Sequence, residues 1–219
     1  MPQYRVMVED NAGKQYEVFP TSYRHSNRLN LEQPATFNFS YADLENIAAE
    51  YEVTVLEMLT TKISKIWAEE KNSSNVYIKN WLGYLTNLDI TPQVDGDRNV
   101  TIQAMDIYGI LVNRIVGLPI TTYAAQDISD ILWDIINDSQ GSDTPYSEYG
   151  ITRGADPATV NVNIEYRFDN VRDAIGKLTN NNLEDGVDID FSTALVFNVY
   201  YPTKGSLKAG VIFDKHSLS

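Results

Sequence analysis

Two runs of alternating apolar and polar residues, separated by a short polar turn, constrain this sequence most. The runs cover residues 76–85 and 100–105, with the turn at 94–99. Successive side chains of a strand point to opposite faces, so this pattern predicts a hairpin with one buried face. The second run continues directly into Asp106 and a helical-looking segment, 111–114. The hairpin therefore ends in a buried-looking acid and a short helix that carries an arginine.

The same alternation, together with turn residues, predicts further strands along the chain. They are expected at residues 4–9, 15–19, 36–41, 160–168, 187–191 and 194–201, with another strand starting at 211–213. Apolar residues at helical spacing predict helices at 43–51, 128–136 and 171–178, the first capped by Asp43 and the last by Asn170. The sequence is thus β-rich with a few helices.

Two features of these segments leave alternatives open. Residues 53–70 have helical spacing, yet their first residues, 53–56, are equally compatible with a strand. Gly83 falls inside a predicted strand, where glycine marks either a bulge or a close approach of another backbone.

Composition restricts the classes of function. The 219 residues carry a formal net charge of −13, which argues against a nucleic-acid-binding surface and against attraction to anionic lipid. The chain has no cysteine, which excludes disulfides and thiol catalysis. No apolar run approaches the length of a membrane span, and the start of the chain alternates like a strand, so we expect no signal peptide and no membrane segment.

Residues for catalysis or metal binding are scarce. His25 and His216 are the only histidines, and both are expected at the surface. Acidic pairs occur at Asp95/Asp97, Glu184/Asp185 and Asp188/Asp190. The first resembles part of a calcium loop without its remaining ligands, and the last is expected on the solvated face of a strand. No glycine pattern for phosphates or dinucleotides is present. The sequence therefore predicts no cofactor, no metal site and no enzyme.

The segment between the second run and the following helix suggests a structural role instead. Asp106 stands where it can cap a helix through its carboxylate. Arg114 offers five donors that can bind carbonyl groups, and Leu111 is expected to anchor the helix in the core. We expect these residues to join one part of the fold to another.

The order of these features resembles a known family. A strand with Trp81, Gly83 and Leu85, a turn, a strand ending in Ala104-Met105-Asp106, and then Leu111 and Arg114 looks like the tail-hub, or baseplate-hub, proteins of long-tailed bacteriophages and prophages. These are minor tail proteins in which a glycine-bearing strand precedes an Ala-x-Asp strand end, and a leucine and an arginine close the first barrel. The helix at 128–136 and the later elements follow in the family's order.

The resemblance implies an α+β fold of two split β-barrels, like those of tail-tube subunits, joined by a helical connector. It places the first barrel with its helix at residues 1–116, the connector and a loop at 117–157, and the second module at 158–219. Because hub proteins are usually longer, the second module is expected to be incomplete and the chain to be a fragment or a shortened version.

The resemblance also implies partners. It predicts a homo-oligomer, a trimeric ring at the tail tip of the virion, which is assembled in the host cytoplasm and contacts other tail or baseplate proteins. DNA would pass through the lumen without specific binding, as the acidic composition allows. Two alternatives stay open: a carbohydrate- or receptor-binding module using the tyrosine-rich loop 145–149, and, ranked last, a cell-wall hydrolase using the acidic pairs.

Overall fold

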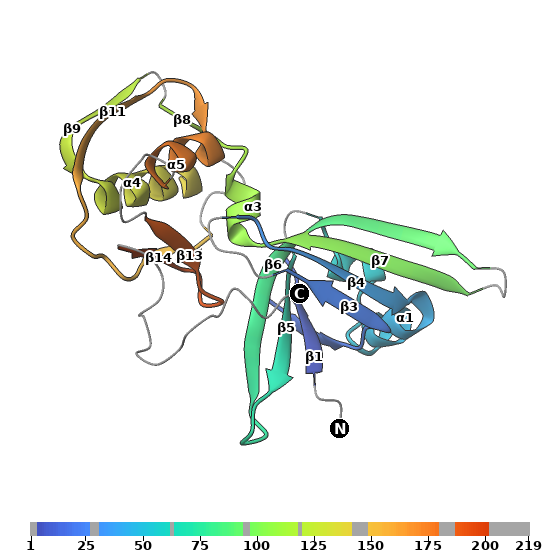
Figure 1. Ribbon diagram of the computed structural model, residues 1–219. Helices are drawn as coiled ribbons and strands as arrows, with labels where there is room; N and C mark the ends of the chain where they lie inside the picture. The colour runs from blue at the N-terminus through green and yellow to red at the C-terminus, as the bar shows by residue number, and fades with distance from the viewer. Residues whose placement is uncertain are drawn as a thin grey trace, which may run out of the picture.

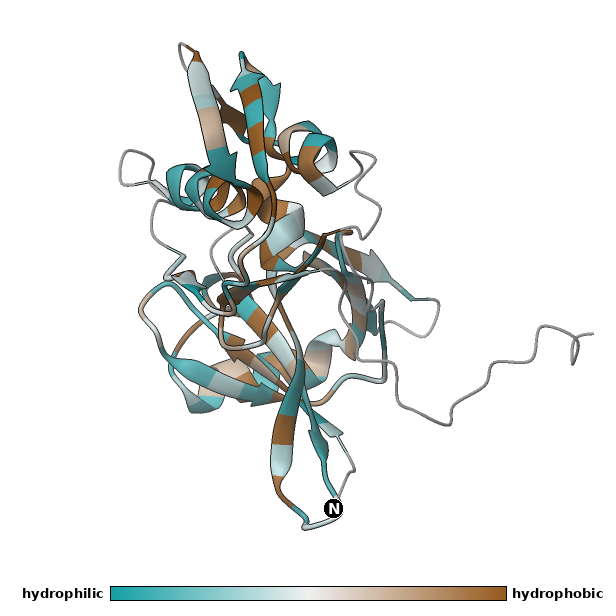
Figure 2. Ribbon diagram, turned by 60° about the vertical axis from the view of Figure 1, so that its left-hand side comes forward, coloured by the Kyte–Doolittle hydropathy of each residue, from teal (hydrophilic) through white to brown (hydrophobic). Residues whose placement is uncertain are grey.

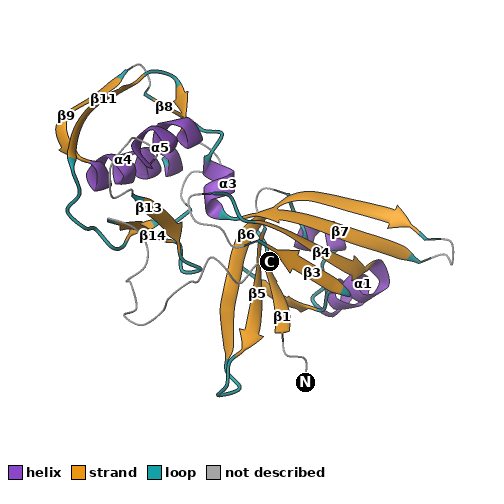
Figure 3. Ribbon diagram, in the orientation of Figure 1, coloured by secondary structure: helices purple, strands orange, loops and turns teal. Residues whose placement is uncertain are grey.

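The computed structural model describes residues 4–26, 31–61, 64–93, 97–117, 120–141, 149–179 and 187–201. Strands predominate over helices in this part of the chain (Figure 3). The buried apolar residues form two separate clusters. We call the elements from β1 to β7, with helices α1 and α2, the first module, and the elements from α3 onward the second module. Figure 1 shows α3 lying between the two groups of elements.

The first module is built on one seven-stranded antiparallel sheet. Its strand order is β2-β1-β5-β6-β7-β4-β3. The strands are β1 (Tyr4–Glu9), β2 (Gln15–Val18), β3 (Ser22–His25), β4 (Pro34–Ser40), β5 (Lys65–Lys71), β6 (Tyr77–Pro92) and β7 (Arg98–Met105). The predicted opening hairpin is confirmed as β1 paired with β2, and the predicted central hairpin as β6 paired with β7. Figure 2 shows alternating hydrophilic and hydrophobic bands along the strands, as a half-buried sheet requires.

This sheet is strongly curled, because its two edge strands are consecutive in sequence. Strands β2 and β3 lie at opposite edges of the sheet, yet only residues 19–21 connect them. Such a connection spans at most about 14 Å, so the two edges must lie near one another. The rings of Tyr4 on β1 and Tyr23 on β3 accordingly lie 5.1 Å apart between centroids. No pairing joins β2 to β3 in the described residues, so the sheet stays open there.

Helices α1 (Tyr41–Glu50) and α2 (Val55–Met58) contribute to the apolar core of the first module. The predicted helix at 43–51 is confirmed, but its cap differs from the prediction. The hydroxyl of Ser40 accepts a hydrogen bond from the Asp43 N–H, so Ser40 is the N-cap and Asp43 lies in the first turn. Asp43 still lies where a negative charge favours a helix N-terminus.

The segment 53–70 proves to be a short helix followed by a strand. Thr54 and Glu57 form a reciprocal capping box at the start of α2. The apolar run at the start of β5 is then buried on both faces, with Ile66, Trp67 and Ala68 at 5% exposure or less. A strand covered on both faces lacks polar alternation, which is why periodicity could not distinguish it from a helix.

In its described residues, the second module packs three helices with short sheets. Its elements are α3 (Ile107–Leu111), β8 (Ile115–Val116), β9 (Thr121–Asp127), α4 (Ile128–Gln140), β10 (Thr152–Arg153), β11 (Asn161–Tyr166), β12 (Asp169–Asn170), α5 (Val171–Thr179), β13 (Asp188–Phe191) and β14 (Val196–Tyr200). The strands pair as β10-β14-β13, β11-β9 and β12-β8. The predicted helices at 128–136 and 171–178 are confirmed as α4 and α5, and Asn170 accepts the capping bond from the Asp173 N–H. The final hairpin is confirmed as β13 and β14.

The β-rich fold class with antiparallel sheets is confirmed, whereas a pair of barrels is not. None of the sheets within the described ranges closes on itself. The helix expected at 111–114 is wrong in position: α3 runs from Ile107 to Leu111, because its N-cap Asp106 starts it directly after β7. The strand predicted at 211–213 and the middle of the turn at 94–99 lie outside the described residues.

Candidate functional site at the junction of the two modules

Gly83 lies in β6 where another backbone comes very close. A Cβ atom at this position would stand 2.5 Å from the carbonyl oxygen of Met105 and 2.3 Å from the indole ring of Trp81. Neither distance is compatible with a side chain unless its neighbours move. The absence of a side chain at Gly83 therefore lets the Met105 carbonyl, at the end of β7, and the Trp81 ring lie directly against the Gly83 backbone.

Asp106 joins α3 to the first module. One carboxylate oxygen accepts a hydrogen bond from the Gly109 N–H at 2.9 Å, which caps the helix, and another from the Gln33 N–H at 3.0 Å. The residue is only 7% exposed. Burial raises the pKa of Asp106, the charge of Asp190 adds to the shift, and the bonds from Gln33 and Gly109 oppose it. Asp106 thus ties the segment before β4 to the start of α3.

Leu111 and Arg114 make their contacts with the second module. Leu111 is fully buried in the second cluster. The Arg114 guanidinium donates to the backbone carbonyl of Ser139 near the end of α4 and to the Tyr149 hydroxyl at 3.3 Å, and it lies 5.2 Å above the Tyr149 ring. A cation near the C-terminal end of a helix satisfies its last carbonyls and complements its dipole. Arg114 therefore holds α4 and Tyr149 to the segment that follows α3.

The four sequence-predicted residues are thus grouped around α3 but do not form one constellation. Asp106 contacts the first module, and Arg114 contacts elements of the second. No hydrogen bond or ion pair joins Asp106 to Arg114 in the part of the chain that the structure describes. The spacing of Asp106 and Arg114 in the sequence predicts that their side chains face the same way. In the structure, the short helix α3 lies between them and the two side chains bind different residues.

Other contacts complete the junction. The indole N–H of Trp81 donates to the Gln33 carbonyl at 3.1 Å, so Gln33 is held through both of its backbone groups. Arg172 at the start of α5 forms an ion pair with Glu32. The rings of Tyr84 on β6 and Tyr149 meet edge to face at 5.1 Å, and Tyr84 packs in the second cluster. The modules are therefore connected by hydrogen bonds, an ion pair and apolar contact.

A cleft of about 190 Å³ lies at this junction, and we call it the junction cleft. Residues of β6 and α3 line it together with residues 190–193 and 195 of the β13–β14 hairpin. Its polar lining includes Asp106, Asp190 and Asn80, and its apolar lining includes Trp81, Ile107 and Phe191.

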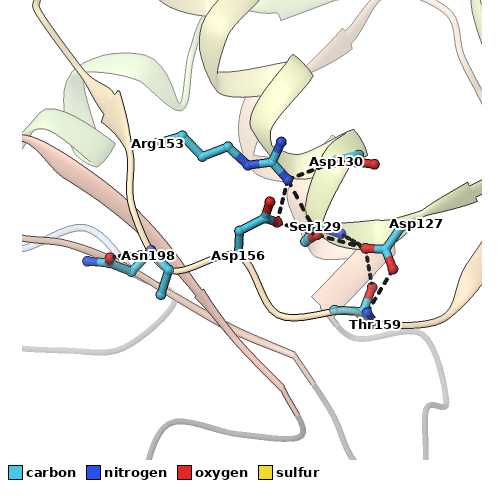
Figure 4. A network of polar contacts seen from close by, with 8 residues as sticks. Asp127, Ser129, Asp130, Arg153, Asp156, Thr159 and Asn198 are labelled. Carbon is cyan, nitrogen blue, oxygen red and sulfur yellow. Dashed lines mark hydrogen bonds and ion pairs between the residues drawn. The ribbon is translucent and has the colours of Figure 1, made fainter.

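A second polar network fixes the N-terminal end of α4 (Figure 4). The N-cap Asp127 accepts bonds from the backbone N–H and the hydroxyl of both Ser129 and Thr159. Arg153 pairs with Asp130 at 2.6 Å and with Asp156 at 2.5 Å. Burial alone would raise the pKa of Asp127, but these hydrogen bonds outweigh it and lower the pKa.

The network at α4 was missed by the sequence analysis, although part of it has a sequence signal. An aspartate directly before an apolar helical stripe is a typical N-cap, and Asp127 fits that pattern. Arg153, Asp156 and Thr159 have no such signal, because they reach the start of α4 only when their segment of the chain folds back onto it.

The candidates for catalysis gain no support from their positions. His25 is half-buried rather than fully at the surface, and it stacks on Tyr23 at 5.8 Å. Burial lowers its pKa. His216, Asp95 and the pair Glu184/Asp185 lie outside the described residues. No group of three or more histidine or acidic residues that could hold a metal ion occurs within the described ranges.

Two further expectations concern the loop and the membrane. Of the loop 145–149, only Tyr149 is described, and it packs against Arg114 and Tyr84 rather than presenting a free ring to a sugar. None of the helices in the described residues has the length and apolar character that a membrane-spanning helix requires.

We compared the chain with protein families, curated proteins and solved structures. No protein-family model matches the sequence. No curated protein matches it either. Among solved structures, the chain is similar to a tail protein from Neisseria meningitidis MC58, with a TM-score of 0.56 at 15% identity over 90% of this chain and 50% of the other. It is also similar to the 43 kDa tail protein of prophage MuSo2 from Shewanella oneidensis, with a TM-score of 0.58 at 12% identity over 96% of this chain and 59% of the other.

A third similar structure is the lidded PdpA–VgrG complex from Francisella, with a TM-score of 0.53 at 10% identity over 93% of this chain and 29% of that one. The chain thus spans 50% and 59% of the length of the two tail proteins. At these identities the likeness concerns the fold. The chain has the fold of phage and prophage tail proteins, in agreement with the resemblance found between Trp81 and Arg114.

Proposed function

We propose that the protein is a structural component of a phage tail tip, a hub that forms a ring and links the tail tube to distal baseplate or receptor-binding parts. The observation that carries this proposal is the likeness of nearly the whole chain to two tail proteins. The proposed location is the tail tip of the virion, after assembly in the host cytoplasm. The proposed role is mechanical, with no catalytic step.

The shape of the first module supports a split barrel. Its seven strands curl until the edge strands β2 and β3 approach one another without pairing. Open edges on a curled sheet leave unpaired backbone groups, which can bind a strand of a neighbouring copy. We propose that such contacts build a homotrimeric ring and that residues 158–219 are part of an incomplete second barrel.

Charge supports a channel for DNA. With 30 acidic and 17 basic residues, the chain repels phosphate, so DNA could pass through a lumen without being held there. The proposed partners are therefore further copies of this chain and other tail or baseplate proteins.

The test is the mass in solution, measured by light scattering at several protein concentrations. A homotrimer would have three times the 24.7 kDa mass of the chain and should persist on dilution. Electron microscopy of that species should then show a ring with a central opening. A strict monomer at every concentration, also in the presence of tail-tube protein, would contradict the ring.

A further inference from the structure

The turn between β5 and β6 is fixed by its own hydrogen bonds. The Asn72 side-chain oxygen accepts bonds from the backbone N–H groups of Ser74 and Val76 at 2.9 and 3.0 Å. The Asn72 N–H donates to the Val76 carbonyl, and Asn75 has a φ of +61°, a conformation that asparagine tolerates. Figure 1 shows the hairpin extending from the sheet with this turn at its far end. The end of the hairpin is therefore a projection of defined shape.

Two β-branched apolar residues at this end are exposed. Val76 is 56% exposed and Ile78 is 52% exposed. The ring of Tyr77, between them in sequence, lies 4.3 Å from the Arg5 guanidinium and 5.1 Å from the Lys71 amine. Burial of Val76 and Ile78 against a partner would be favourable, and it would lose little conformational entropy because the turn is already held in place.

The end of the hairpin is basic on an acidic chain. Residues 71–79 contain Lys71, Lys79 and no acidic residue, which gives them a formal charge of +2. The whole chain has a charge of −13, so this +2 leaves −15 on all its other residues. Glu69 and Glu70, which precede the range, accept hydrogen bonds from side chains of neighbouring strands. The charge of the hairpin end is therefore complementary to the rest of another copy of this chain.

The order of residues along the hairpin favours a protein surface over a lipid membrane. Residues 72–75 at the turn are Asn-Ser-Ser-Asn, and all four are exposed. A membrane would have to take in this polar turn together with Val76 and Ile78, and each polar group without a hydrogen-bond partner there would cost free energy. A protein surface can instead receive the turn through hydrogen bonds.

From these observations, we propose that the end of the β5–β6 hairpin docks on a second copy of this chain. Val76 and Ile78 become buried in the contact, and Lys71 lies close to acidic residues of the second copy. Two hairpins would repel one another through their lysines, so the hairpin meets a different surface of its neighbour, as a closed ring requires. The choice of a second copy rests on the proposed function, because the ring is what brings a copy to the hairpin.

The experiment is photo-crosslinking from the turn. The chain has no cysteine, so Ser74→Cys gives a single site for benzophenone maleimide. The labelled full chain is mixed with unlabelled chain enriched in ¹⁵N, irradiated and analysed by mass spectrometry. The expected result is a crosslinked pair of one labelled chain and one ¹⁵N chain. The matched control is Ala12→Cys in the exposed β1–β2 turn of the same sheet, which should give few or no such pairs.

Further substitutions in the labelled chain test which side chains make the contact. Val76→Ser/Ile78→Ser should lower the yield of crosslinked pairs about tenfold, the size expected for loss of an apolar anchor. Lys71→Glu should lower the yield most at low salt, because screening weakens a charge contact. Leu56→Ser is the control: Leu56 is 63% exposed on α2, and its loss should leave the yield unchanged. The replaced apolar residues are exposed, so these variants should keep the wild-type melting temperature.

Three results would overturn the proposal: no crosslinked pairs from Ser74→Cys, an equal yield from Ala12→Cys, or an unchanged yield in Val76→Ser/Ile78→Ser. Transfer of the crosslink to added phosphatidylglycerol vesicles or to tail-tube protein would also overturn it, because each is a different occupant. A homotrimer in solution without crosslinks from the turn would leave the hub and remove the hairpin contact. Crosslinked pairs from a chain that never reaches the trimer mass would do the reverse.

Discussion

At the scale of single residues, the junction depends on one position without a side chain. We expect Gly83→Ala to lower the free energy of unfolding by about 2–3 kcal/mol, because the new methyl group would overlap the Met105 carbonyl and the Trp81 ring. Urea denaturation measures the change. Gly13→Asn is the control: Gly13 has a φ of +79° with nothing near its Cβ position, and asparagine tolerates that conformation. Equal stability of Gly83→Ala and the wild type would refute the close approach.

Asp106 carries two backbone hydrogen bonds, so the effect of a substitution depends on whether the acceptor survives. Asp106→Ala should lower the free energy of unfolding by about 2 kcal/mol, since it removes the N-cap bond from the Gly109 N–H and the bond from the Gln33 N–H. Asp106→Asn should cost much less, because the amide oxygen still accepts and the uncharged side chain is easier to bury. Thermal denaturation of both variants at neutral pH tests this order. The reverse order would mean that the charge itself is what holds Gln33.

At the scale of secondary-structure elements, α4 depends on its N-cap. Asp127→Ala should lower stability by about 1–2 kcal/mol at neutral pH, because Asp127 caps α4 and also holds Thr159. The folded state lowers the pKa of Asp127 below its ordinary value of 3.8. Its stabilising contribution is therefore present above that value and is lost as the pH falls through the folded pKa. Denaturation curves of wild type and variant should converge in strong acid.

The same helix carries three aspartates at positions i, i+4 and i+8: Asp130, Asp134 and Asp138. Burial raises the pKa of the central Asp134, and the charges of Asp138 and Asp130 add to the shift. A raised pKa means that ionisation of Asp134 costs stability as the pH rises through it. Asp134→Asn should therefore raise stability at neutral pH by about 0.5 kcal/mol, the size of two like-charge pairs on a helix.

The melting temperature at neutral and acidic pH is the measurement for Asp134→Asn. The gain should shrink as the pH falls below the folded pKa of Asp134 and disappear below the ordinary value of 3.8, where the wild-type side chain is uncharged in both the folded and the unfolded state. A gain of the same size in acid would assign the effect to packing rather than to charge.

At the scale of the whole molecule, contacts around α3 connect two apolar clusters. We expect the wild type to unfold in one transition, because Asp106 and Tyr84 couple each cluster to the other module. The double variant Asp106→Ala/Arg114→Ala should unfold in two transitions, since it removes the bond to Gln33 and the bonds that place Ser139 and Tyr149. Differential scanning calorimetry distinguishes one transition from two.

A control with a comparable loss of stability but an intact junction is Ile135→Ala, a truncation inside the second cluster that lowers the free energy of unfolding by about 2–5 kcal/mol. It should shift the single transition without dividing it. A double variant that still unfolds in one step would show that the apolar contacts alone couple the modules.

Sequence by itself determined the elements whose information is local. Alternation specified the hairpins β1–β2, β6–β7 and β13–β14, and helical stripes specified α4 and α5, the second of them together with its cap Asn170. It also singled out Asp106 as the cap of a short helix, because capping depends on a few neighbouring residues. The overall acidity, which argues against a nucleic-acid-binding surface, needs no structure.

Only the tertiary structure decided which distant segments meet. The pairing of β1 with β5 and of β4 with β7 joins segments far apart in the chain, and local patterns do not encode such partners. The strand β5 could not be distinguished from a helix until both of its faces were covered. The partners of Arg114, the network around Arg153 and the junction cleft exist because the chain folds back on itself, so their residues become neighbours in space alone.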